Sequence, residues 1–287
     1  MSVRSVGIAG SGVMGGGIAE VAARSGFDVV LRSRAQSTAD AALGRMVKSF
    51  AKQVEKGKLS VDESEAAVGR VRVTGDLGEL EPCDIVVESV VEDLDTKREL
   101  FKELDHVCPE GTVLATNTST LPVGELAVAT DRPDRVVGVH FFNPAPRMPL
   151  VEIVPTLTTS ADTTARAHRF AEDCGKEPVT VKDRAGFIVN ALLFPYLNGA
   201  VQMLDGGTAS RDGIDAAMRG GCGFPMGPLE LLDLVGLDTS LAILNALNEE
   251  QPSPCHVPAP LLKRMVAAGH LGRKAGKGFY DYATNGR

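Results

Sequence analysis

The chain has 287 residues, 44% of them apolar and 23% charged, which is typical of a globular protein with one large or two ordinary domains. A formal net charge of −7 argues against general nucleic-acid binding. No apolar run is long enough for a membrane span or a signal peptide, so we expect no membrane association. The five cysteines are scattered without any paired spacing, which argues against a disulfide framework or a zinc site and favours a reducing, cytoplasmic location.

Short apolar runs alternate with helical patterns in the first part of the chain, which predicts a largely parallel sheet covered on both faces. The predicted strands are 6–9, 28–31, 84–88, 112–116, 135–141, 150–156 and 178–183, and the predicted helices are 16–25, 42–57, 94–107 and 163–173. From residue 186 onward only helical patterns follow, at 186–204, 213–220, 228–236, 237–247 and 260–269. We therefore expect an α/β Rossmann-type domain over 1–184 and an all-α domain over 185–287.

The stretch VGIAGSGVMGGGIAE contains Gly10, Gly12 and Gly15 at the Gly-x-Gly-x-x-Gly spacing, with Val13 and Met14 inside it. The spacing alone is common, but here a predicted strand precedes it and a helix follows. The glycines would permit a tight turn, close approach of a pyrophosphate and close helix–strand packing. The N-terminus of the helix would favour the diphosphate charge, so the stretch predicts a dinucleotide site.

A second feature lies at the end of the second predicted strand. NAD-binding folds usually carry an acidic residue there, whereas this chain has Ser33 between Arg32 and Arg34. A hydroxyl and two guanidinium groups would suit the 2′-phosphate of NADP. We therefore expect NADP(H) to be favoured, with NAD(H) possible if both arginines are only solvated loop residues.

Four polar residues are candidates for catalysis. Ser119 follows the strand 112–116, His140 lies near the end of the strand 135–141, and Glu152 comes twelve residues after His140. Reacting groups in open α/β sheets gather at the carboxyl ends of strands, and a histidine with a carboxylate partner can act as a general base. Ser119 and Asn190 could stabilise negative charge on a carbonyl oxygen. Each residue taken singly also has an ordinary structural role open to it.

Together these segments make a family recognisable. GSGVMGGGIAE, VVESVVEDLDTKRELFKEL, NTSTLP, HFFNPAPRMPLVEIV, DRAGFIVNALLFPYLNGA, FPMGPLELLDLVGLDT and LGRKAGKGFYDY run from end to end of the chain. The sequence resembles the L-3-hydroxyacyl-CoA dehydrogenase family, in particular its stand-alone bacterial 3-hydroxybutyryl-CoA dehydrogenases. The resemblance implies that His140 is the general base and Glu152 its partner, and that Ser119 and Asn190 contact the 3-oxygen of the substrate.

The resemblance also implies a cofactor-binding role for Glu92 and Lys97 near the nicotinamide, and for Asn117 and Asn143 around the same cleft. It implies that the helical domain mediates a homodimer and closes over the acyl chain. Ser33 departs from the NAD-using relatives, so NAD dependence cannot be carried over.

An acidic protein that binds coenzyme A needs a local basic patch. Lys48, Lys52 and Lys56 repeat every four residues on the predicted helix 42–57, and Ser49 and Lys56 match positions at which relatives contact CoA. An ordinary solvated helix face would show the same pattern. The phosphopantetheine arm and the acidic surface of an acyl carrier protein could also use this patch.

The leading hypothesis is an oxidoreductase that interconverts (3S)-3-hydroxyacyl-CoA, especially 3-hydroxybutyryl-CoA, and 3-ketoacyl-CoA with NADP(H) or NAD(H). One alternative is a hydroxyacyl-carrier-protein dehydrogenase of a biosynthetic pathway. Another is a nucleotide-binding structural or regulatory protein without turnover, which would have no need of a base with its partner. NADPH use would favour reduction, and so the supply of hydroxyacyl units to biosynthesis rather than the breakdown of fatty acids.

Overall fold

The computed structural model describes residues 3–282, and these residues form two compact units. The division falls between Asp183 and Arg184, one residue before the boundary that the sequence predicts. The first unit is a Rossmann-type α/β domain and the second is helical, so the predicted fold class is confirmed. Among the described residues, no helix combines the length and apolarity needed to cross a membrane.

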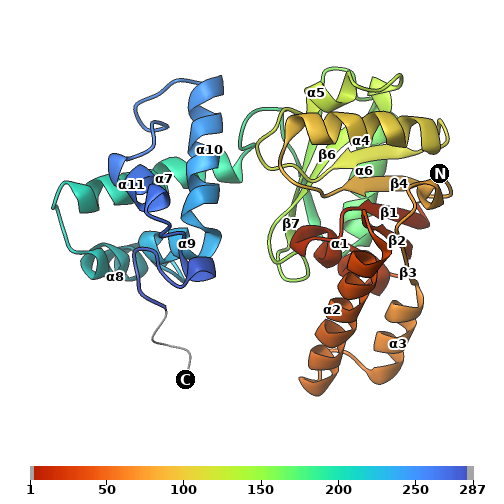
Figure 1. The fold of residues 1–287 in the computed structure, drawn as a ribbon, viewed down its shortest axis with the longest axis horizontal. Coiled ribbons are helices and arrows are strands. Elements are labelled where there is room, and N and C mark those ends of the chain that lie inside the picture. Colours follow the sequence, from red (N-terminus) through yellow and green to blue (C-terminus); the bar gives the residue numbers. More distant parts are fainter. Residues whose placement is uncertain (1–2, 283–287) are drawn as a thin grey trace. The chain divides into compact units, whose positions relative to one another are not determined.

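The first unit is built on one sheet of eight strands in the order β3-β2-β1-β4-β5-β6-β7-β8 (Figure 1). The strands are β1 (Ser5–Ala9), β2 (Asp28–Arg32), β3 (Val71–Thr74), β4 (Ile85–Glu88), β5 (Val113–Thr116), β6 (Val136–Phe141), β7 (Leu150–Pro155) and β8 (Glu177–Thr180). Every residue of β4, β5 and β6 is buried, which explains why these strands are almost continuously apolar.

Strands β1 to β6 are parallel, but β7 runs antiparallel to β6. The reason lies in the connection, because residues 142–149 are too few to form a crossover helix. The chain therefore turns back directly, and the register places His140 opposite Glu152. As a result, the start of β7 lies at the same edge of the sheet as the end of β6.

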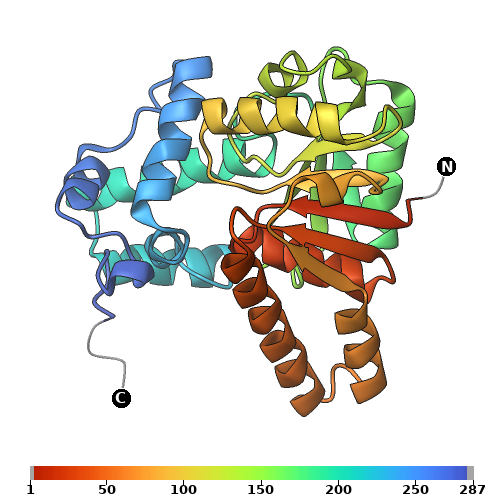
Figure 2. The same ribbon diagram turned by 45° about the vertical axis from the view of Figure 1, so that its right-hand side comes forward.

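Helices cover both faces of this sheet. The helices of the first unit are α1 (Val13–Arg24), α2 (Gln36–Glu55), α3 (Val61–Gly69), α4 (Leu94–Val107), α5 (Val123–Ala127) and α6 (Ala161–Asp173). Apolar side chains of α1, α2 and α6 share one core with the sheet, and α4 and α5 cover the opposite face (Figure 2). In both views α2 and α3 lie side by side and extend beyond the sheet.

The second unit is a group of helices around its own apolar core. Its helices are α7 (Val189–Asp205), α8 (Arg211–Cys222), α9 (Pro228–Val235), α10 (Leu237–Glu250) and α11 (Pro260–Ala267). Phe194 and Leu197 of α7 pack with Leu232 of α9 and Leu244 of α10 in this core.

Candidate active site

The glycine-rich loop between β1 and α1 has the geometry of a dinucleotide site. Gly10 adopts φ +129°, and a Cβ there would lie 2.3 Å from the Ser89 carbonyl oxygen. A Cβ on Gly15 would lie 1.9 Å from the Gly10 carbonyl oxygen, whereas one on Gly12 would meet nothing within 4 Å. Gly12 is therefore the glycine that leaves the loop surface open to a ligand.

The start of α1 supports the same function. Gly12 caps this helix without a side-chain hydrogen bond, and no acidic residue lies in its first turn. The first N–H groups of α1 thus meet no capping side chain and suit a diphosphate. Val13 is exposed beside them, and the Met14 side chain packs against the core.

The Ser33 hydroxyl belongs to a short chain of hydrogen bonds. Ser11 donates to Ser33 over 2.7 Å, the oxygens of Ser33 and Thr38 lie 2.6 Å apart, and Thr38 donates to the Ala35 carbonyl over 2.7 Å. Either oxygen of the Ser33–Thr38 pair can be the donor, so the Ser33 hydroxyl is held between Ser11 and Thr38. The role of Ser33 at a phosphate therefore stays a prediction.

The two flanking arginines differ in their surroundings. The Nε of Arg32 is buried and has no hydrogen-bond partner among residues 3–282, while Arg34 is exposed. A buried N–H without a partner is costly, and an anion at the end of β2 would supply one. The residues at this position therefore fit a phosphate through Arg32 and Arg34.

His140 and Glu152 form a buried pair across β6 and β7. The His140 Nδ1 lies 2.7 Å from the Glu152 Oε2, and the side chains are only 7% and 1% exposed. The Phe142 ring packs on the imidazole with its centre 4.5 Å away. The pair that the sequence suggested from spacing is thus in direct contact, and it is the arrangement of a general base with its orienting carboxylate.

The loop after His140 is held from two sides. Asn117, just after β5, accepts a hydrogen bond from the Phe141 N–H over 2.8 Å through its Oδ1. The Lys176 ammonium donates to the carbonyls of Ala145 and Met148 over 2.7 and 2.9 Å. Asn117 therefore fixes the backbone next to His140, and Lys176 fixes the loop that carries Asn143.

Glu92 organises the loop that carries Ser119. Its Oε1 accepts hydrogen bonds from the Thr118 hydroxyl over 2.5 Å and from the Ser119 N–H over 2.9 Å, and the Ser119 hydroxyl lies 3.4 Å away. Burial raises the pKa of the Glu92 carboxyl, but Lys97 and these hydrogen bonds outweigh that effect and hold the pKa below its ordinary value. Lys97 itself is 1% exposed, so it lies behind Glu92 rather than on the surface of the site.

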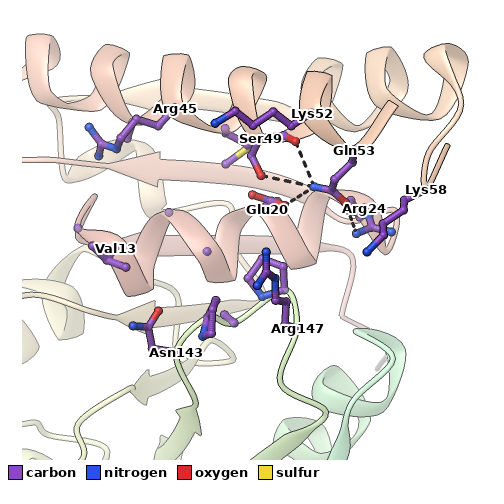
Figure 3. Close-up of a pocket in the computed structure, with 18 of the residues that line it drawn as sticks. Val13, Glu20, Arg24, Arg45, Ser49, Lys52, Gln53, Lys58, Asn143 and Arg147 are labelled. Atoms are coloured by element: carbon purple, nitrogen blue, oxygen red, sulfur yellow. Dashed lines mark hydrogen bonds between the residues drawn. The ribbon is translucent and has the colours of Figure 1, made fainter. Parts of the chain in front are cut away.

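A pocket of about 780 Å³ opens between α1, α2 and the loop after β6 (Figure 3). Its floor is the glycine face of α1, and Ser49, Lys52 and Lys56 line it from α2, together with Asn143 from the loop. Six basic residues line the pocket, against one carboxylate from Glu20: Arg24, Arg45, Lys52, Lys56, Lys58 and Arg147. Lys48, which the sequence grouped with Lys52 and Lys56, is not among the lining residues.

Asn190 lies on α7 in the second unit and is 9% exposed. The other predicted catalytic residues belong to the first unit. The role of Asn190 at the substrate oxygen therefore stays a prediction.

Several residues of the site were missed from the sequence. Arg45 reaches from α2 to the Ser11 carbonyl of the glycine-rich loop over 2.9 Å, and Arg24 and Arg147 add charge to the pocket. Glu88 ends β4 as a fully buried carboxylate. Its position at the carboxyl end of a predicted strand was a signal that could have singled it out.

A dinucleotide-binding loop at the same sheet edge as a buried histidine–carboxylate pair defines the chain as an oxidoreductase of the nicotinamide-dependent dehydrogenase class. Comparisons with known proteins agree. Residues 5–184 match the family model described as "3-hydroxyacyl-CoA dehydrogenase, NAD binding domain", and residues 186–282 match "3-hydroxyacyl-CoA dehydrogenase, C-terminal domain". The chain belongs to the 3-hydroxyacyl-CoA dehydrogenase family, and its cofactor is NAD(H) or NADP(H).

Individual relatives are similar over nearly the whole length. The chain is 47% identical to the 3-hydroxybutyryl-CoA dehydrogenase of Mycobacterium tuberculosis, over 98% of this chain and 99% of that one. The crystal structure of M. tuberculosis FadB2 covers 98% of this chain and 100% of its own, with a TM-score of 0.96 and 46% identity. That of (S)-3-hydroxybutyryl-CoA dehydrogenase PaaH1 from Ralstonia eutropha covers 98% and 99%, with a TM-score of 0.95 and 40% identity.

Proposed function

We propose that this protein interconverts (3S)-3-hydroxybutyryl-CoA, or a similarly short 3-hydroxyacyl-CoA, and the corresponding 3-ketoacyl-CoA, with NADP(H) as the favoured cofactor. The observation that carries the proposal is the buried contact between His140 and Glu152 at the sheet edge of the glycine-rich loop. The names of the M. tuberculosis and R. eutropha relatives support the substrate class.

The chemistry follows from the two ring nitrogens of His140. Because Nδ1 is engaged by Glu152, proton exchange with the substrate falls to Nε2. In oxidation His140 accepts the proton of the 3-hydroxyl group, and Glu152 stabilises the resulting imidazolium. In reduction the imidazolium returns this proton, while Ser119 and Asn190 donate hydrogen bonds to the 3-oxygen. When bound, the nicotinamide supplies or accepts the hydride.

The basic pocket supports coenzyme A as the acyl carrier. It joins the glycine-rich loop to a cluster of ammonium and guanidinium groups, including Lys52, Lys56 and Arg147. Phosphate groups of CoA would find charge-assisted donors there, and Ser49 adds a hydroxyl. A carrier protein presents only one phosphate on its pantetheine arm and its acidic groups on an outer surface, whereas these basic residues line a pocket, which favours CoA.

The cofactor preference is supported by the charges at the end of β2. Arg32 has a buried N–H without a partner among the described residues, Arg34 is exposed, and no carboxylate stands at position 33 to repel a phosphate. A charge-assisted bond to a phosphate is worth about 1.5–3 kcal/mol, which corresponds to about tenfold or more in specificity.

The test of the preference is a series of initial rates of acetoacetyl-CoA reduction with NADPH and with NADH. We expect kcat/KM to be about tenfold or more higher with NADPH. The advantage should be lost when Arg32 and Arg34 are both replaced by Ala, whereas Arg169→Ala, an exposed arginine on α6, should keep it. A native preference for NADH would overturn the NADP assignment and leave the dehydrogenase intact. Activity only with acetoacetyl-acyl carrier protein would overturn the CoA assignment.

We also propose that the protein is a cytoplasmic homodimer that associates through its second unit. Leu192 is 72% exposed, Leu234 50% and Phe224 43%, and large exposed apolar side chains favour a protein interface. All five cysteines are free thiols, in keeping with a reducing compartment. Light scattering after gel filtration should give twice the chain mass, and Leu192→Glu should give the monomer.

A further inference from the structure

Glu88 is a buried charge for which the proposed mechanism has no use. It is the last residue of β4 and its side chain is 0% exposed. Its Oε1 accepts hydrogen bonds from the Val90 N–H over 2.6 Å and from the Lys97 ammonium over 2.7 Å. Its Oε2 accepts one from the Thr116 hydroxyl over 2.7 Å. Three donors therefore hold this carboxylate in a single position.

Lys97 connects Glu88 to a second carboxylate. Its ammonium lies 2.7 Å from Glu88 and 3.2 Å from the Oε2 of Glu92, so it bridges the two side chains. The three groups carry one positive and two negative charges, and Lys97 and Glu88 are almost completely buried. A buried ion pair seldom stabilises a fold more than apolar residues of the same size would, so stability alone is a weak explanation for it.

The other oxygen of Glu92 holds the loop of Ser119. It accepts the Ser119 N–H over 2.9 Å and the Thr118 hydroxyl over 2.5 Å, and the Thr120 N–H lies 3.3 Å away. Glu92 is thus placed between Lys97 on one side and the Ser119 loop on the other.

We propose that Glu88 is a positioning residue for Ser119, acting through Lys97 and Glu92. Glu88 holds the ammonium at the end of β4 and shares its charge, which leaves Glu92 available to the loop. Without the Glu88 charge, Lys97 would pair with Glu92 alone and draw it away from the Ser119 N–H. This inference rests on the proposed role of Ser119 at the 3-oxygen of the substrate.

The test is a double-mutant cycle of Glu88→Gln and Ser119→Ala, measured by acetoacetyl-CoA reduction. Glutamine has the shape of glutamate and can still accept from Val90, but it carries no charge. We expect Glu88→Gln to lower kcat about tenfold with the substrate KM nearly unchanged, because only the hydrogen bond from Ser119 to the reacting 3-oxygen is weakened. In the Ser119→Ala background the same change should lower kcat less than about twofold, because the effects of two substitutions are not additive when one residue acts through the other.

A matched control is Asp105→Asn, which removes the charge of a partly buried ion pair with Arg132 in the same unit, away from the site. It should lower the melting temperature and leave kcat unchanged. If Glu88→Gln does not fold, Glu88→Asp keeps the charge but shortens the side chain that reaches Lys97 by one methylene group. It should give a smaller loss of kcat with the same dependence on Ser119.

Two outcomes would overturn the proposed role of Glu88 and leave the proposed function intact. One is an unchanged kcat in a folded Glu88→Gln variant, and the other is an equal loss in both backgrounds. A native protein that reduces no acetoacetyl thioester would instead overturn the proposed function, and the role of Glu88 with it.

Discussion

The proposed base depends on a single carboxylate. Glu152 is 0% exposed and contacts the His140 Nδ1 over 2.7 Å, so it both orients the ring and offers a full negative charge to the imidazolium. An amide in its place could still accept the hydrogen of Nδ1, but it would stabilise the charged ring much less. Orientation and charge can therefore be separated by one substitution.

We predict that Glu152→Gln lowers kcat about 100-fold while the cofactor Kd stays nearly unchanged. The chain has no tryptophan, so the fluorescence of the reduced cofactor itself can report its binding. Glu177→Gln, an exposed glutamate on the neighbouring strand β8, should keep the native kcat. A native kcat in Glu152→Gln would contradict this prediction, because it would show that Glu152 orients the His140 ring without stabilising its charge.

At the scale of elements, two glycines of one loop have different tasks. A Cβ on Gly15 would collide with the Gly10 carbonyl oxygen, so a glycine is needed here for α1 to pack closely against the loop that follows β1. A Cβ on Gly12 would meet no protein atom within 4 Å, so packing does not require a glycine here. The absence of a side chain instead leaves room for a ligand against the loop.

We predict that Gly12→Ala keeps the native free energy of unfolding but weakens cofactor binding at least about tenfold, since the methyl group occupies the place of the diphosphate. Gly15→Ala should lower the free energy of unfolding by about 2 kcal/mol, because the loop and helix must move apart. Urea unfolding and titration with NADPH measure the two effects. Native cofactor affinity in Gly12→Ala would contradict the placement of the diphosphate.

The elements also show how far the sequence could predict the fold. Strong apolar runs and helical periodicity gave most strands and helices correctly, and 94–107 agrees at both ends with α4. Strand β3 was missed because it is a short edge strand with Arg72 exposed in the middle. Helix α3 was missed although Ser60 and Glu63 form a capping box, a signal that the sequence contains.

The site was predictable where it depended on spacing along the chain. The glycine-rich loop and the approach of His140 to Glu152 follow from local patterns and a short turn. Burial and competing hydrogen bonds were not predictable, because they depend on side chains from distant segments. Thus the Ser33 hydroxyl contacts Ser11 and Thr38, and Lys97 lies behind Glu92 rather than on the surface.

For the molecule as a whole, the distribution of charge is more informative than its sum. The net charge is −7, yet the pocket beside the glycine-rich loop is strongly basic. An acidic protein repels a polyphosphate ligand at long range, so this local cluster must provide the attraction. Salt screens that attraction, and the apparent affinity for acyl-CoA should therefore fall as ionic strength rises.

We predict that the KM for acetoacetyl-CoA rises at least about threefold between low and high salt, whereas the KM for an uncharged acetoacetyl-pantetheine does not. Replacing both Lys52 and Lys56 by Ala should flatten the salt dependence. Lys48→Ala offers a matched control, because it removes a lysine of the same helix that does not line the pocket. Equal salt dependence for the two thioesters would exclude the pocket as the CoA site.

The proposed reaction and its base are tested together by the oxidation of (3S)-3-hydroxybutyryl-CoA and of its (3R) epimer by the native protein and by His140→Ala. We predict turnover of the (3S) epimer by the native protein and a loss of about 10³-fold in kcat on replacing His140. The control His168→Ala, a histidine of α6 outside the site, should keep the native rate. No turnover by the native protein would exclude the proposed dehydrogenase activity, and an undiminished rate in His140→Ala would exclude His140 as the base.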